Sequence, residues 1–148
     1  SVWDRGLRAV SRRYPSVVEA IDPEASTVEW AAAALRAFWA ESRAREAVTA
    51  IACYNDLTAM GAYAAAAEAG LRVPRDVSVT GFDDVQARLL VPALTSVSHM
   101  LVEMGQRAVE LLLQMVEDRD RTAALRGYRE EIVPTLRTRS STAAPVVP

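Results

Sequence analysis

Residues 47–56 read AVTAIACYND, a continuous apolar run that ends in an asparagine and an aspartate. The apolar part, over 47–54, is typical of a parallel strand that is buried on both faces of a sheet. An alanine-rich stretch follows directly, and it predicts a helix over 56–69 with Gly70 as its C-terminal glycine. A strand, a polar turn and a helix therefore succeed one another within one short segment.

The same order recurs on both sides of this segment. Downstream, residues 77–82 (VSVTGF) predict a second strand, which ends at Asp83 and Asp84. Strands and helices that alternate at this spacing form right-handed crossovers. The sequence therefore predicts the α/β class, with a parallel sheet covered by helices on both faces. The remaining predicted elements are helices over 4–14, 28–43 and 100–118, helical turns over 85–90, and strands over 17–21, 94–98, 128–133 and 135–138.

Composition excludes several classes of function. The chain has 148 residues, is 51% hydrophobic and 24% charged, and carries a net charge of −2 without a basic run, so direct contact of this chain with nucleic acid is not expected. One cysteine and one histidine exclude a disulfide framework and a zinc site, so no metal and no cofactor are predicted. The apolar stretches are too short for a bilayer and the N-terminus lacks a signal peptide, so we expect a cytoplasmic protein without membrane contact.

Two polar pairs follow successive predicted strands, Asn55-Asp56 after the first and Asp83-Asp84 after the second. In open parallel sheets, ligands bind beyond the carboxyl ends of the strands, where such pairs lie. The competing interpretation is that these side chains cap the helices that follow them. We favour capping for Asp56 and Asp84, and ligand binding for Asn55 and Asp83.

Several motifs together resemble the LacI/GalR family of bacterial transcriptional regulators. They occur in the family's order and spacing, and the similarity runs from about residue 47 to residue 142. It implies a periplasmic-binding-protein-like type I fold, in which two α/β lobes close over a small molecule. The motifs are NDLTAMGA (55–62), GLRVPRDVSVTGFDD (70–84), PALTSV (92–97), MGQRAVELL (104–112) and RSST (139–142).

The resemblance also implies a division of the chain. Residues 1–98 correspond to the C-terminal lobe without its first strand, 99–134 return to the N-terminal lobe, 135–142 form a closing strand, and 143–148 are a tail. The DNA-binding head and the first lobe of such regulators precede the segment that is matched here. The helix over 100–118, whose apolar stripe would pack on that first lobe, is therefore expected to lack its partner. This stripe comprises Leu101, Met104, Ala108, Leu111, Leu112 and Met115.

By the same resemblance, Asn55 and Asp83 contact the effector, a sugar or a related small molecule. Family members usually carry an arginine where this chain has Trp3, so either Arg5 takes its place or Trp3 offers a stacking surface instead. His99 stands where glutamine is frequent, and a neutral imidazole also offers one donor and one acceptor. A core position for Trp3 and a backbone-bonded hinge position for His99 are the competing interpretations.

Family dimers pair their second lobes through elements that carry Met60, Tyr63, Leu89 and Leu90 here, although an intramolecular core is the alternative for each of them. Cys53 lies within an apolar strand and is expected to be a buried, unreactive thiol. No catalytic motif is present, so the chain is not expected to be an enzyme. The leading hypothesis is the effector-sensing module of a DNA-binding regulator that forms homodimers. The alternatives are a sugar-binding protein of a transport system and a flavodoxin-like enzyme, and the latter lacks the required phosphate-binding loop.

Overall fold

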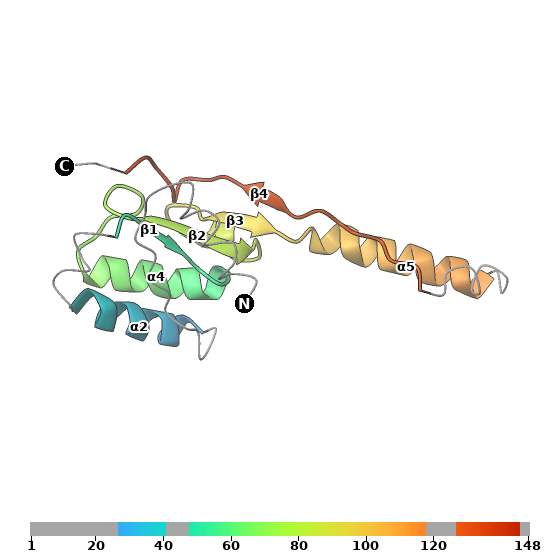
Figure 1. The fold of residues 1–148 in the computed structure, drawn as a ribbon, viewed down its shortest axis with the longest axis horizontal. Helices are drawn as coiled ribbons and strands as arrows, with labels where there is room; N and C mark the ends of the chain where they lie inside the picture. Colours follow the sequence, from blue (N-terminus) through green and yellow to red (C-terminus); the bar gives the residue numbers. More distant parts are fainter. Residues whose placement is uncertain (1–26, 41–47, 118–126, 146–148) are drawn as a thin grey trace.

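The computed structural model describes residues 27–40, 48–117 and 127–145. Their centre is a four-stranded sheet in the order β1 (Ala50–Ala52), β2 (Ser78–Asp83), β3 (Thr95–Ser98) and β4 (Thr135–Arg137), shown in Figure 1. The first three strands run parallel, whereas β4 pairs antiparallel with β3. The predicted α/β class is therefore confirmed, and the antiparallel edge strand makes the sheet mixed.

Helices α2 (Val28–Ala40) and α4 (Asp56–Glu68) lie on the same side of this sheet, so within the described residues helices cover one face, whereas the sequence predicts helices on both faces. Figure 1 shows α4 next to the strands and α2 on the outer side of α4. The short 3₁₀ helix η1 (Ala87–Leu89) follows β2, as the predicted helical turns over 85–90 indicated. The helix and the strand expected over 4–14 and 17–21 lie outside the described residues.

Helices α2 and α4 approach closely because small residues line their contact. A Cβ atom added at Gly61 of α4 would lie 2.4 Å from the carbonyl oxygen of Val28 and 2.7 Å from the Cβ atom of Ala31. Ala32 and Ala62 are also buried. The alanine-rich sequence that predicts the helix thus also sets the distance at which the two helices pack.

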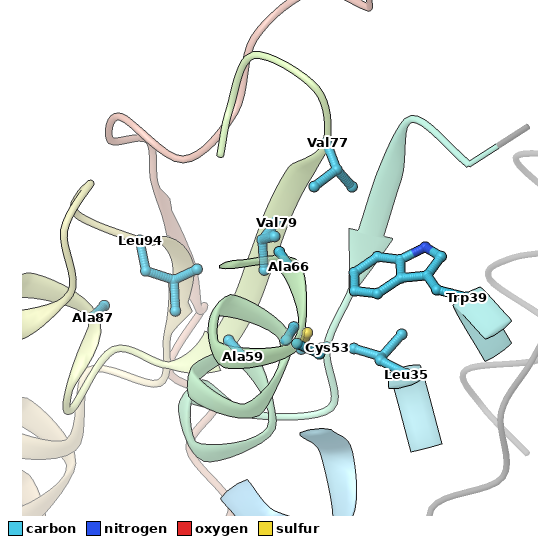
Figure 2. Close-up of a cluster of buried hydrophobic side chains, with 11 residues drawn as sticks. Leu35, Trp39, Cys53, Ala59, Ala66, Val77, Val79, Ala87 and Leu94 are labelled. Atoms are coloured by element: carbon cyan, nitrogen blue, oxygen red, sulfur yellow. The ribbon is translucent and has the colours of Figure 1, made fainter. Parts of the chain in front are cut away.

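Larger side chains fill the space between the helices and the sheet. Leu35 and Trp39 of α2 meet the buried residues of the strands and of α4, as Figure 2 shows. Val77, Val79 and Leu94 are almost completely shielded from solvent. The core therefore joins both helices to β2 and to the residue that precedes β3.

The predicted strand over 128–133 is wrong, because these residues form no strand in the structure. The segment instead runs beside helix α5 (Leu101–Glu117), where the Nε atom of Arg107 donates to the Glu130 carboxylate at 2.8 Å. Tyr128 donates to the same carboxylate at 3.1 Å. Sheet pairing begins only at Thr135, which lies opposite Ser98 at the end of β3.

Helix α5 projects from the body of the molecule together with this returning segment (Figure 1). None of its residues is buried, although the sequence gives it an apolar stripe. Leu112 is 59% exposed and Val116 is 81% exposed. Of the described helices, none is both long and apolar enough to span a bilayer.

The RSST motif at 139–142 forms hydrogen bonds with β2, with β3 and with the residue before β3. The Ser141 hydroxyl accepts from the backbone N–H of Thr95 at 2.7 Å and donates to the carbonyl of Val79 at 2.6 Å. The guanidinium of Arg139 donates to the carbonyl of Leu94 at 2.7 Å. This motif therefore fastens β2 to β3 at the end of the sheet remote from α5.

Candidate functional site

Asn55 follows β1 and caps helix α4. Its side-chain oxygen accepts from the backbone N–H of Thr58 at 2.8 Å, while the Thr58 hydroxyl accepts from the backbone N–H of Asn55 at 3.0 Å. This reciprocal arrangement is a capping box. The helix is therefore capped by Asn55, and the prediction that Asp56 is the cap is wrong. The amide nitrogen of Asn55 lies outside this box and provides donors for other contacts.

Asp56 organises the loop that follows β2. It is fully buried, and its Oδ2 atom accepts from the backbone N–H groups of Val85, Gln86 and Ala87 at 2.8, 3.1 and 3.1 Å. Its Oδ1 atom accepts from the Ser96 hydroxyl at 2.7 Å. Asp56 is therefore a structural anchor of the site.

The backbone of β2 has to make room for this carboxylate. A Cβ atom at Gly81 would lie 2.7 Å from Oδ1 of Asp56, so only glycine fits there. The sequence does not show which residue approaches Gly81, because the two residues lie on different elements. A glycine within a strand is a signal that another group approaches the backbone there closely.

The side chains of Asp83 and Asp84 contact different partners. Both adopt the left-handed backbone region, with φ of 99° and 59°, which is costly for residues other than glycine and is concentrated at functional sites. Asp84 forms an ion pair of 2.6 Å with Arg139, and both side chains are largely buried. The prediction that Asp84 caps a helix is therefore wrong, since its carboxylate holds the closing motif instead.

Asp83 remains partly exposed and meets His99. The two side chains come together because Asp83 ends β2 opposite Ser98, and His99 is the next residue of the chain. The Nε2 atom of His99 lies 3.2 Å from Oδ1 of Asp83, and the side chains are 38% and 39% exposed. The imidazole also meets the ring of Phe82 edge to face, with centroids 4.5 Å apart.

The structure describes some of the predicted site residues and not others. Asn55 and Asp83 follow neighbouring parallel strands, since Ala52 pairs with Thr80, and they lie at the same edge of the sheet. That both side chains face one common cleft stays a prediction. Trp3 and Arg5 lie outside the described residues. Within the described part, no group of three or more potential metal ligands is present.

The four residues expected at a dimer interface differ in exposure. Leu89 is 80% exposed, whereas Met60 is partly buried. Leu90 and Tyr63 pack against the core, and the Tyr63 hydroxyl donates to the carbonyl of Pro92 at 2.8 Å. Burial raises the pKa of Tyr63. Of these four residues, only Leu89 therefore exposes most of its side chain.

Cys53 is buried in the core, as the sequence predicts. Loss of hydration raises the pKa of its thiol to about 12, and the nearby carboxylate of Asp56 adds to the shift. The thiolate is the reactive form of cysteine. Cys53 is therefore a packing residue in this fold.

Comparison with known proteins agrees with this fold. The family described as "Periplasmic binding protein-like domain" matches residues 3–142. The chain belongs to this family.

Its relatives identify the branch of the family. The chain is 40% identical over 98 residues to the HTH-type transcriptional repressor PurR of Haemophilus influenzae strain PittEE. The aligned residues cover 65% of this chain and 29% of the repressor. A LacI family transcriptional regulator from Arthrobacter sp. FB24, solved in complex with lactose, is 34% identical with a TM-score of 0.67. That match covers 79% of this chain and 42% of the regulator.

A LacI family regulator from Enterococcus faecalis V583, solved with bound ribose, gives a TM-score of 0.69 at 26% identity and covers 93% of this chain and 48% of that regulator. The predicted resemblance to LacI/GalR regulators is therefore confirmed. The chain spans less than a third of the length of the PurR repressor and less than half of these two solved regulators.

Proposed function

We propose that this chain is the effector-sensing part of a LacI-type transcriptional regulator, and that its effector is a sugar or a related polyol. The observation that carries the proposal is the partly exposed Asp83 carboxylate at the carboxyl end of β2. A carboxylate accepts hydrogen bonds from hydroxyl groups, which is what recognition of a polyol requires. The solved regulators with bound lactose and ribose support the same ligand class.

In this proposal, effector binding changes the relative position of two lobes and thereby the affinity for operator DNA. Residues 1–98 and the closing strand over 135–142 belong to the sensing lobe, and 99–134 belong to the other lobe. DNA is contacted by a region other than these residues. The protein acts in the cytoplasm as a homodimer, whose contact includes Leu89 and Met60.

A sugar-binding protein of a transport system is the second candidate, because such proteins share the fold. Two relatives favour the regulator, since PurR and the ribose operon repressor are both repressors. The same relatives support a role in binding without catalysis. A regulator binds a specific operator, whereas a transport protein does not, so operator selection from random DNA by the full-length protein separates the two candidates.

Replacement of Asp83 tests the effector site. We expect Asp83→Ala to weaken binding of lactose or ribose about tenfold to a hundredfold, because a charged hydrogen bond contributes about 1.5 to 3 kcal/mol. DNA affinity without effector should stay nearly unchanged. Titration calorimetry of the full-length protein measures the sugar affinity.

Asp76→Ala is the matched control, because Asp76 pairs with Arg72 just before β2, at the opposite end of that strand. An unchanged dissociation constant in Asp83→Ala, or an equal loss in Asp76→Ala, would contradict the assignment.

A further inference from the structure

Two contacts of His99 with described residues involve the end of β2. Its Nε2 atom lies 3.2 Å from Oδ1 of Asp83, and its ring stands at 83° to that of Phe82. An aromatic contact of this kind restrains the plane of the imidazole. The imidazole therefore stands beside the Asp83 carboxylate in a restrained orientation.

The Asp83 side chain needs such a restraint. Its backbone is in the left-handed region at φ 99°, and the next residue, Asp84, continues there at φ 59°. The side chain is 39% exposed, so packing leaves it room to adopt several rotamers. A binding group that is free to rotate loses conformational entropy when it captures a ligand, whereas a pre-oriented group loses less.

We propose that His99 is a positioning residue, which orients the Asp83 carboxylate for the effector and acts through Asp83 rather than by touching the ligand. This inference rests on the proposed function, because it takes Asp83 as the group that binds the sugar. It differs from the sequence-based expectation that His99 itself contacts the effector. One contact to His99 leaves most of the acceptor capacity of the carboxylate for ligand hydroxyls.

The first test needs no ligand. The chain contains a single histidine, so a ¹⁵N NMR spectrum of its imidazole nitrogens shows one set of signals. A free neutral histidine already favours protonation at Nε2, so we expect a larger share of this tautomer in the protein, and Asp83→Ala should lower that share to the value of a free histidine. Asp83→Asn, which keeps the shape and removes the charge, should move the signals in the same direction. Asp76→Ala should leave them unchanged.

The second test is a double-mutant cycle on sugar affinity in the full-length protein. We expect His99→Ala to weaken binding of lactose or ribose about threefold to tenfold, as loss of one polar contact to the carboxylate implies. In the Asp83→Ala background, His99→Ala should have no further effect. His99→Gln, which retains a side-chain N–H donor, should restore most of the affinity.

The outcomes separate this inference from the proposed function. Additive effects of the two alanine substitutions would show that His99 contacts the sugar independently, and would overturn the positioning role. Imidazole signals that stay unchanged in Asp83→Ala and Asp83→Asn would also overturn the positioning role, whatever the sugar affinity. Absence of lactose and ribose binding by the unaltered protein would overturn the proposed ligand class and the role of His99 in binding it, even if the imidazole test showed that the pair forms.

Discussion

The buried carboxylate of Asp56 accepts hydrogen bonds from three consecutive backbone N–H groups and from the Ser96 hydroxyl. The contacts of Ala87 and Ser96 are buried, and each unsatisfied buried donor costs about 1 to 3 kcal/mol. We therefore expect Asp56→Ala to lower the free energy of unfolding by at least about 2 kcal/mol, measured by urea denaturation. The loss should appear even though Asp56 touches no ligand in the proposed site.

Asp56→Asn is the matched variant, because it keeps the shape and one acceptor oxygen. It should retain much of the stability that Asp56→Ala loses. Its amide oxygen can face either the loop donors or the Ser96 hydroxyl, which Asp56 contacts through its two different oxygens. Equal and small losses in both variants would contradict the role of Asp56 as the anchor of the loop.

At the scale of residues, the sequence predicted where two candidate residues lie. Polar residues at a strand end indicate a place where a ligand can bind, so the positions of Asp83 and Asn55 at the carboxyl ends of neighbouring strands followed from the order of residues. The pairing of His99 with Asp83 depends on the register of β2 and β3, which no local pattern reports. The role of Asp56 was misjudged because a residue at a helix start resembles a cap until its distant partners are known.

At the scale of elements, glycines in two helices have opposite roles. Gly61 lies where α2 and α4 touch, so Gly61→Ala should lower the free energy of unfolding by about 1 to 3 kcal/mol through overpacking. Gly105 in α5 has no atom within 4 Å of the added methyl group, so Gly105→Ala should favour the helix by roughly 0.5 to 1 kcal/mol.

Both glycine variants are compared by thermal and urea unfolding, and α5 is also followed by amide hydrogen exchange because it projects from the body. Because both variants replace glycine by alanine, Gly105→Ala is the control for Gly61→Ala. A loss of stability at both sites, or at neither, would show that the close approach of α2 and α4 does not depend on Gly61.

The segment beside α5 should respond to acid. Hydrogen bonds from Arg107 lower the pKa of Glu130 below its ordinary value of 4.5, so the folded form holds this carboxylate charged more strongly than the unfolded form does. The stabilisation is therefore complete above about pH 4.5 and is lost as the pH falls through the lower folded pKa. We expect amide exchange in 128–133 to quicken in that range relative to its intrinsic rate at each pH.

Arg107→Gln is the control for this acid response. Without the guanidinium, the depressed pKa of Glu130 should return toward its ordinary value, and the protection of the segment should be low already at neutral pH. A segment that stays protected in Arg107→Gln would be held by contacts other than this ion pair.

The elements themselves were largely predictable, and their exceptions have physical reasons. Periodicity and apolar runs located α4, α5, β2 and β3 to within one or two residues. The run over 128–133 has the composition of a strand, but the sheet edge that it would need ends near Ser98, and an ion pair with α5 holds it elsewhere. Local propensity reports what a segment favours, and tertiary contacts decide whether a partner strand is within reach.

At the scale of the whole molecule, the exposure of α5 predicts self-association. Large apolar side chains in water are unfavourable by about 1.5 to 3 kcal/mol each relative to burial, and α5 presents several of them. We expect sedimentation equilibrium of the 148-residue chain to show species heavier than the 16.1 kDa monomer at micromolar concentration. A single 16.1 kDa species would contradict this.

Two variants locate the associating surface. Leu112 and Val116 are four residues apart and share a helix face, so Leu112→Gln combined with Val116→Gln should shift the chain toward monomer. Leu89→Gln alters the exposed position in η1 instead. Association that survives the α5 variant but is abolished by Leu89→Gln would assign the contact to the dimer surface expected from the family.

The fastening of the sheet by Ser141 has a kinetic consequence. Its hydroxyl joins Val79 and Thr95, which are 62 and 46 positions away in the chain. Contacts between such distant positions require closure of long loops, which slows the search for the native topology. During synthesis, β2 and β3 leave the ribosome before Ser141, so the nascent chain has to hold these two strands together through their direct pairing until the linking hydroxyl follows.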